Sequence, residues 1–216
     1  MSAVHSIPNL KNNSPNNVRR MKTFFDQVYP LIQKYHKQDH VEFELRLGKI
    51  NRGSFDTNVG KETFDRILRG LEKYKGWEKV SETSDICYYH ENIRLTIDDN
   101  SEESKQVIKQ KLEKVDKSFT NRPLDVRFAV AKETPFVKDD IEFSMARQRH
   151  RKSFVRKGLS IDMTIVSGNP ADLDSEEEET YQVELEFLNP IEDDKNTLYN
   201  MFYKVSDILD IISVRP

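Results

Sequence analysis

The sequence lacks most features that mark secreted, disulfide-stabilised or membrane-spanning proteins. It contains one cysteine, Cys87, so no disulfide can form within the chain, and this suits a reducing compartment. No segment approaches the roughly 18 consecutive apolar residues of a membrane span. The N-terminal residues also lack the apolar stretch of a signal peptide. These absences predict a soluble intracellular protein that does not act at a membrane.

The chain also lacks a strong charge of one sign. Its 34 basic and 37 acidic residues give a net charge of −3, whereas nucleic-acid-binding surfaces usually show a clear basic excess. Any recognition of phosphates must therefore be local. Charged residues make up 33% of the sequence and hydrophobic residues 36%. Either the core is modest, or the fold keeps many charges in its interior.

Several motifs of nucleotide and phosphate enzymes are missing as well. Gly60-Lys61 lacks the glycine that a P-loop needs five positions earlier. The segment 114–117, KVDK, lacks the glycine of the nucleotidyltransferase motif K-x-D-G, so we do not expect transfer of a nucleotide. No cysteine-phosphatase motif surrounds Cys87, which we interpret as a packed strand residue. His36 and His40 are interpreted as a helix end, since no H-E-x-x-H is present.

Hydrophobic periodicity predicts three helices with nine strands between them. Apolar residues recur at helical spacing over 17–37, 61–75 and 194–212. The period changes to two, as in strands, over 41–49, 77–84, 85–91, 92–98, 105–117, 124–133, 140–156, 159–167 and 180–188. The segments 98–104 and 157–158 have the composition of hairpin turns.

The domain organisation follows from composition. Residues 1–16 are rich in Asn, Ser and Pro and predict a disordered tail, and 17–216 then form a single domain. The run 172–179, DLDSEEEE, predicts a solvated acidic loop. Many antiparallel strands with few helices predict an α+β fold built on a closed barrel. About eight strands enclose an interior just wide enough to be filled by side chains.

The strands 41–48 and 181–188 each carry an E-x-E pattern opposite an apolar face. The plain alternative is a half-buried strand whose polar face meets water. Glutamate is a poor strand former, however, and neighbouring carboxylates on one face repel each other. Convergence on a hard divalent cation would account for both strands. The four carboxylates are Glu42, Glu44, Glu184 and Glu186.

Other strands place basic side chains on one face. Three arginines of 145–153 share a face and repel one another unless anions neutralise them. Each basic strand alone could be a solvent-facing edge that deters aggregation. Together with the carboxylates, they predict a barrel interior in which glutamates hold a metal, and the metal and basic side chains hold a polyphosphate. The basic candidates are Arg94, Lys109, Lys111, Arg147, Arg149 and Arg151, and the polar residues that share faces in these strands are Ser153, Asp162 and Thr164.

Taken in order, these motifs resemble the triphosphate tunnel metalloenzymes, and more narrowly the RNA triphosphatases of fungi, protozoa and large DNA viruses. The resemblance spans about 41–188. It rests on a first E-x-E-x-[K/R] strand, basic middle strands, an R-x-K-x-R-x-S-like strand, a D-x-T strand and a final E-x-E strand. The opening VEFELRLG is most similar to capping enzymes of giant DNA viruses of the mimivirus type. Gln182 departs from the third glutamate of the yeast-type enzymes, and Arg149 replaces a lysine.

The resemblance implies a hydrolase that removes the γ-phosphate of triphosphate-ended RNA, leaving a diphosphate end, as the first step of mRNA capping. Nucleoside triphosphates would be further substrates. The four glutamates would hold Mg²⁺ or Mn²⁺ and, with Arg94 and Arg149, would be catalytic. The six basic residues would bind phosphate, and a supporting set would orient their neighbours: Arg46, Ser153, Asp162 and Thr164.

The resemblance also implies partners and a location. Guanylyltransferase and methyltransferase modules would act with this chain, either in the same polypeptide or as separate proteins. A viral protein would be cytoplasmic or associated with the virion, and a cellular one nuclear.

Two alternatives stay open. The same fold could hydrolyse inorganic triphosphate, thiamine triphosphate or free nucleotides, although Arg46-Leu47-Gly48 after the first E-x-E is more similar to the RNA branch. A non-catalytic phosphate-binding scaffold of a capping complex would need the arginines but not four glutamates.

Overall fold

The computed structural model describes residues 15–101, 103–119, 122–168, 179–188, 191 and 194–213. Its elements are α1 (Pro15–Tyr35), β1 (Val41–Asn51), β2 (Ser54–Asp56), α2 (Lys61–Lys73), β3 (Lys79–His90), β4 (Ile93–Asp98), β5 (Ser104–Lys117), β6 (Asp125–Pro135), β7 (Met145–Arg156), β8 (Leu159–Ser167), β9 (Thr180–Phe187) and α3 (Lys195–Ser213). The three predicted helices are confirmed.

Two predicted segments fall largely outside the described residues. Residues 1–14 of the predicted disordered tail lie outside the described residues, and Pro15 and Asn16 already belong to α1. Residues 172–178 of the predicted acidic loop 172–179 also lie outside them. None of the described helices has the length and apolar character needed to cross a bilayer.

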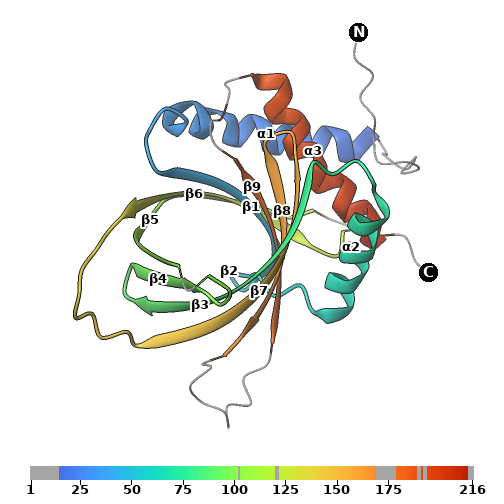
Figure 1. Ribbon diagram of the computed structural model, residues 1–216. Helices are drawn as coiled ribbons and strands as arrows, with labels where there is room; N and C mark the ends of the chain where they lie inside the picture. Colours follow the sequence, from blue (N-terminus) through green and yellow to red (C-terminus); the bar gives the residue numbers. More distant parts are fainter. Residues whose placement is uncertain are drawn as a thin grey trace.

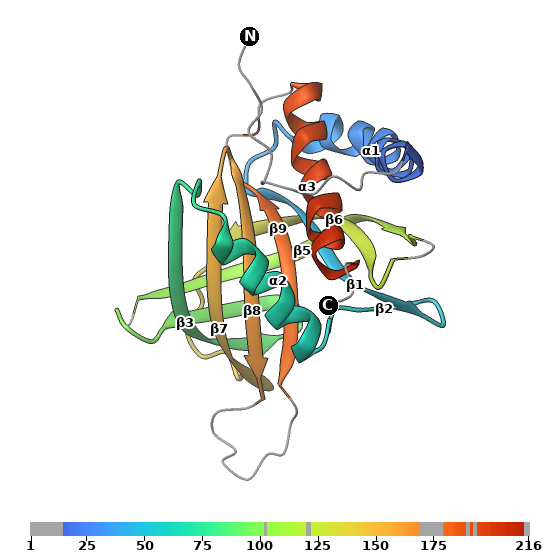
Figure 2. The ribbon, with the colours of Figure 1, turned by 90° about the vertical axis from the view of Figure 1, so that its right-hand side faces the viewer.

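Eight strands close into an antiparallel barrel, which confirms the predicted fold class. Their order is β1-β6-β5-β4-β3-β7-β8-β9, and β9 pairs with β1 to complete the ring. The short strand β2 extends the wall by pairing with the end of β1. Figure 1 looks into the barrel, and Figure 2 shows the strands from the side.

Two strand predictions were wrong in detail, and one short strand was not predicted. The segments 77–84 and 85–91 form one strand, β3, because its pairing with β7 runs without interruption from Lys79 to Tyr89. The strand predicted from residue 140 begins at Met145, and 136–144 connect β6 to β7. The strand β2 was missed because three residues are too short to show periodicity.

The hydrophobic core lies outside the barrel, between its wall and the helices. The ring of Phe202 on α3 contacts Phe24 and Phe25 of α1, Phe128 of β6 and Phe187 of β9, and all five are buried. Figures 1 and 2 show the helices grouped on one side of the barrel. Because the apolar faces of the wall strands turn outward to the helices, their polar faces turn inward.

Two tight turns place the strands. The pair Lys157-Gly158 forms the predicted turn between β7 and β8, with φ of 49° and 71°, as in a type I′ hairpin. At the end of β1, a Cβ on Gly48 would lie 2.1 Å from the carbonyl oxygen of Asp56. Only glycine therefore lets β2 fold back this closely on β1.

Candidate active site

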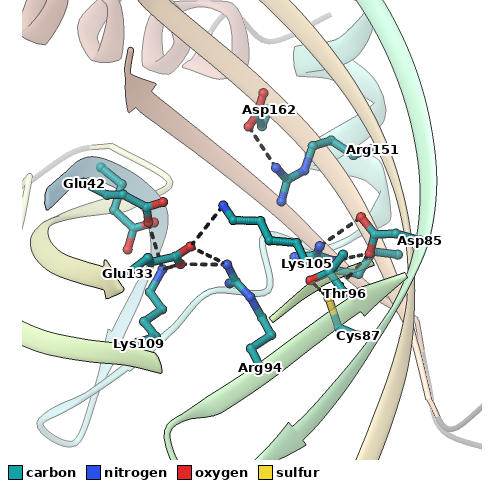
Figure 3. Close-up of polar contacts among 12 residues, drawn as sticks. Glu42, Asp85, Cys87, Arg94, Thr96, Lys105, Lys109, Glu133, Arg151 and Asp162 are labelled. Carbon is teal, nitrogen blue, oxygen red and sulfur yellow. Dashed lines mark hydrogen bonds and ion pairs between the residues drawn. The ribbon is translucent and has the colours of Figure 1, made fainter. Parts of the chain in front are cut away.

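Charged side chains from opposite walls of the barrel point into its interior. Figure 3 shows Glu42, Lys109, Glu133 and Arg94 on one side of this space and Arg151 with Asp162 across it. This arrangement follows from strand alternation, because the residues between them face outward. In β1, for example, Phe43 and Leu45 are fully buried against the helices, while Glu42 and Glu44 face inward.

Closure of the barrel brings the two E-x-E strands side by side. Glu44 of β1 lies opposite Glu186 of β9, and Arg46 lies opposite Glu184. Arg46 forms ion pairs with both neighbours: its Nη2 lies 3.0 Å from Glu44 Oε2, and its Nε lies 3.0 Å from Glu184 Oε1. The four predicted glutamates therefore share one part of the interior, and Arg46 links the two strands.

These carboxylates do not share one electrostatic environment. Burial, followed by the nearby charges of Glu42 and Asp162, raises the pKa of Glu186 to about 7. Burial likewise raises the pKa of Glu42. Burial would also raise the pKa of Glu184, but the combined positive charges of Arg46, Arg151, Lys109 and Arg149 outweigh burial and lower that pKa. A surplus of negative charge therefore gathers around Glu42 and Glu186.

A divalent cation fits this surplus. Among the residues that the structure describes, no group of three or more His, Cys, Asp or Glu side chains is arranged to hold a metal ion as it stands. The donors present are nonetheless carboxylate oxygens, the ligands that hard cations such as Mg²⁺ prefer. The repulsion that Glu42 exerts on Glu186 is the kind of strain that a bound cation relieves.

A buried carboxylate that the sequence analysis missed, Glu133 on β6, positions two of the predicted basic residues. Arg94 Nη2 donates to both carboxylate oxygens of Glu133 at 2.7 Å, and Lys109 Nζ donates to Oε1 at 2.8 Å. Lys109 also donates to Glu42 Oε2 at 3.3 Å. Burial would raise the pKa of Glu133, but Lys109 and Arg94 lower it to about 2. Glu133 is therefore ionised, and it holds both cations toward the glutamates.

The only signal for Glu133 in the sequence was weak. In β6, DVRFAVAKETP, it shares a face with Ala129 and Ala131, opposite buried Phe128 and Val130. A single glutamate near a strand end resembles any solvent-facing residue, so periodicity alone does not identify it.

A second missed carboxylate, Asp85 on β3, holds Arg149. The two residues lie opposite each other in the β3–β7 pair, and Arg149 donates from Nε and Nη2 at 2.7 and 2.9 Å to the two oxygens of Asp85. Next to them, Cys87 is fully buried as predicted, but it belongs to the interior face, where its Sγ lies 3.3 Å from Thr96 Oγ1.

Arg151 is held by the predicted supporting residues of β8. Its Nη1 donates to Asp162 Oδ2 at 3.4 Å, and its Nε donates to Thr164 Oγ1 at 3.3 Å. Ser160 donates to the other oxygen of Asp162 at 2.6 Å. Ser153 lies opposite Asp162 in the β7–β8 pair.

The structure separates the two predicted lysines of β5. Lys109 takes part in the ion pairs with Glu42 and Glu133, whereas Lys111 is exposed, opposite Ala131 and beside a bulge. Lys105, which the sequence analysis did not single out, also points inward (Figure 3), and its Nζ lies 4.0 Å from Glu133. Its side chain remains 68% exposed.

This arrangement defines the class of protein. A closed barrel whose interior combines carboxylates with anchored guanidinium and ammonium groups has the form of a triphosphate tunnel.

The family model described as mRNA capping enzyme, beta chain, matches residues 72–200, more than half of the chain. The chain therefore belongs to this family of mRNA triphosphatases, which are hydrolases.

Individual relatives agree with this assignment. The 5′RNA triphosphatase A449R of Paramecium bursaria Chlorella virus 1 is 28% identical over 204 residues, which cover 88% of this chain and 91% of the relative. The S. pombe Pct1 RNA triphosphatase matches in fold, with a TM-score of 0.66 and 16% identity over 97% of this chain and 91% of that one. The RNA triphosphatase domain of a mimivirus mRNA capping enzyme matches with a TM-score of 0.62 and 19% identity, over 93% and 99%.

Proposed function

We propose that this chain removes the γ-phosphate from triphosphate-ended RNA in a metal-dependent hydrolysis that leaves a diphosphate end for capping. Membership of the mRNA triphosphatase family supports the reaction. The observation that carries the metal dependence is the meeting of β1 and β9, which gathers Glu42, Glu44, Glu184 and Glu186 beside the basic side chains.

Glu42, Glu44 and Glu186, with Glu184 beside them, would hold Mg²⁺ or Mn²⁺. A metal bound there supplies positive charge for the γ-phosphate and withdraws electrons from phosphorus. Since the pKa of Glu42 and that of Glu186 are both raised, this corner of the interior favours a cation over a further anion.

The arginines would bind the phosphate oxygens while their own carboxylates keep them in place. Asp85 accepts hydrogen bonds from two nitrogens of Arg149. Because a guanidinium carries five N–H groups in all, Arg149 retains donors for phosphate. Arg94 on Glu133 and Arg151 on Asp162 are anchored in the same way. Anchored donors stabilise the charge of the transferring phosphoryl group without having to reorganise.

The water that attacks phosphorus has to lose a proton. We propose that one of the interior glutamates accepts this proton, while Glu133 holds Lys109 and Arg94 in place.

The wider assignments rest on the chemistry of the product. A diphosphate RNA end is a substrate for guanylyl transfer, so guanylyltransferase and methyltransferase modules, in the same polypeptide or separate, would act next. Nucleoside triphosphates offer the same phosphate chain and would also be hydrolysed. With a viral relative, the site of action would be the cytoplasm or the virion.

The test follows phosphate released from γ-labelled triphosphate RNA with Mg²⁺ or Mn²⁺ and with chelator. We expect metal-dependent release that leaves a diphosphate end. Release from inorganic triphosphate alone would instead establish a small-triphosphate hydrolase, and metal-independent binding without turnover would establish a scaffold.

Variants test the metal ligands. Glu42→Ala or Glu186→Ala should lower kcat by about 100-fold or more, because each removes an oxygen ligand. The control is Glu62→Ala, which removes an exposed glutamate of α2 and should keep full activity. A folded Glu42 or Glu186 variant with wild-type activity would contradict the metal site.

A further inference from the structure

The interior of the barrel changes character along its axis. Neighbouring strands are antiparallel and their registers are known, so inward residues can be followed toward the same end on every strand. Toward the end where β3 finishes and β7 begins, fewer of the inward side chains are acidic. In that direction the inward residues of β1 are Glu42, Glu44 and Arg46, and those of β9 are Glu186, Glu184 and Gln182. On β8 they are Asp162, Thr164 and Val166, and on β3 they are Asp85, Cys87 and Tyr89.

The same end carries a basic residue without an acidic partner. On β7 the inward residues in this direction are Arg151, Arg149, Arg147 and Met145. Asp162 pairs with Arg151 and Asp85 pairs with Arg149. Within the described part of the chain, no carboxylate forms an ion pair with Arg147. Its charge is therefore available to an anion that enters from this end.

Tyr89 is an aromatic residue at this end of the interior. It lies opposite Arg94 of β4 and opposite Met145 of β7. Its backbone carbonyl accepts hydrogen bonds from the backbone N–H of Ser144 at 3.0 Å and from the Ser144 hydroxyl at 3.3 Å, so the rim holds it in place. The phenol is partly buried near Arg149 and Arg94, while Met145 beside it is 42% exposed. The ring therefore lies between the phosphate-binding arginines and solvent.

We propose that the RNA extends out of the barrel at this end, with the 5′ nucleoside against the ring of Tyr89 and the nearest internucleotide phosphate on Arg147. This rests on the proposed function, which places the γ-phosphate at the acidic end. Asp85 and Tyr89 are four positions apart on β3, about 13 Å of extended strand, and this length gives room for a phosphate chain along the strand. Nucleobases stack on aromatic rings whatever their sequence. Tyr89 thus distinguishes a nucleotide-bearing triphosphate from an inorganic one.

The experiment compares hydrolysis of a short triphosphate RNA with that of tripolyphosphate in Mn²⁺. Tyr89→Ala should raise KM for the RNA by about tenfold, while kcat and the KM for tripolyphosphate stay within twofold of wild type. Tyr89→Phe keeps the ring and should behave as wild type. The matched control is Tyr88→Ala, the neighbouring tyrosine on the outer face, which packs on Phe143 and should not change the ratio of the two KM values.

The outcomes separate the two proposals. If wild-type protein hydrolyses RNA and Tyr89→Ala affects both substrates equally or neither, the proposed exit is wrong and the proposed function stands. If wild-type protein hydrolyses tripolyphosphate but not RNA, both are overturned. Should Tyr89→Ala fail to fold, Tyr89→Leu fills the space without an aromatic face and gives the same comparison.

Discussion

At the scale of single residues, the interior consists of charged groups that hold one another in place. Glu133 holds Arg94 and Lys109, and Asp85 holds Arg149. Buried pairs of this kind contribute little net stability, because desolvation offsets their attraction. Their role here is geometric, since each carboxylate fixes the position of the guanidinium or ammonium group that it pairs with.

The raised pKa of Glu186 makes the stability of the metal-free protein depend on pH. Its pKa is about 7 in the folded state against 4.5 for an ordinary glutamate, so the folded state binds this proton more tightly. The resulting stabilisation is present below about pH 4.5 and is lost as pH rises through about 7. We expect Glu186→Gln in chelator to lose less thermal stability than wild type between pH 5.5 and pH 8.

Metal provides the control for this prediction. Mn²⁺ added at pH 8 should raise the melting temperature of the wild type more than that of Glu186→Gln, because a ligand that binds only the folded state stabilises it. Identical pH profiles for the two proteins in chelator would show that Glu186 titrates normally.

At the scale of elements, β1 combines two tasks. Its inward residues face the candidate metal site, and its end carries the hairpin to β2. The backbone of β2 approaches Gly48 so closely that a Cβ would lie 2.1 Å from Asp56 O and 2.6 Å from the Phe55 ring.

Gly48→Ala should therefore lower the free energy of unfolding by about 1–3 kcal/mol, measured by urea denaturation, because backbone atoms have to shift. Gly53→Ala, at the hairpin tip, is the matched control. A Cβ added at Gly53 would meet no atom within 4 Å, so only backbone strain at its φ of 82° should lower the free energy of unfolding, by about 1 kcal/mol. Equal losses in the two variants would mean that β2 moves away from β1 without cost.

At the scale of the whole molecule, the barrel wall separates two environments. The aromatic cluster around Phe202 lies between the helices and the wall, and the charges lie on the other side of the wall. The position of the glutamates therefore depends on a core that none of them touches directly.

Phe202→Ala should lower the free energy of unfolding by about 3–5 kcal/mol, because it leaves a cavity among four phenylalanine rings. Val137→Ala is the control, since Val137 is 88% exposed and its loss should leave stability unchanged. Scanning calorimetry measures both, and a Phe202 variant as stable as wild type would show that the helices are not needed to hold the wall.

The sequence alone determined the helices, most strands, and which residues share a face. Alternation depends only on neighbouring residues, so VEFELRLG and YQVELEFL revealed their charged faces without a structure. A long strand that contains a run of polar residues was harder to recognise. The run SETSD within β3 has the composition of a turn between two strands, and its pairing with β7 keeps it extended.

The tertiary structure decided how these faces meet. Closure of β1 on β9 sets Glu44 opposite Glu186, and the registers of β3–β7 and β5–β6 give Arg149 and Lys109 their carboxylates. Glu133 and Asp85 could not be identified earlier, because their importance comes from partners on other strands. The bulge beside Lys111 is likewise a feature of two paired strands. An ion pair depends on distance between strands, and local periodicity carries no information about that distance.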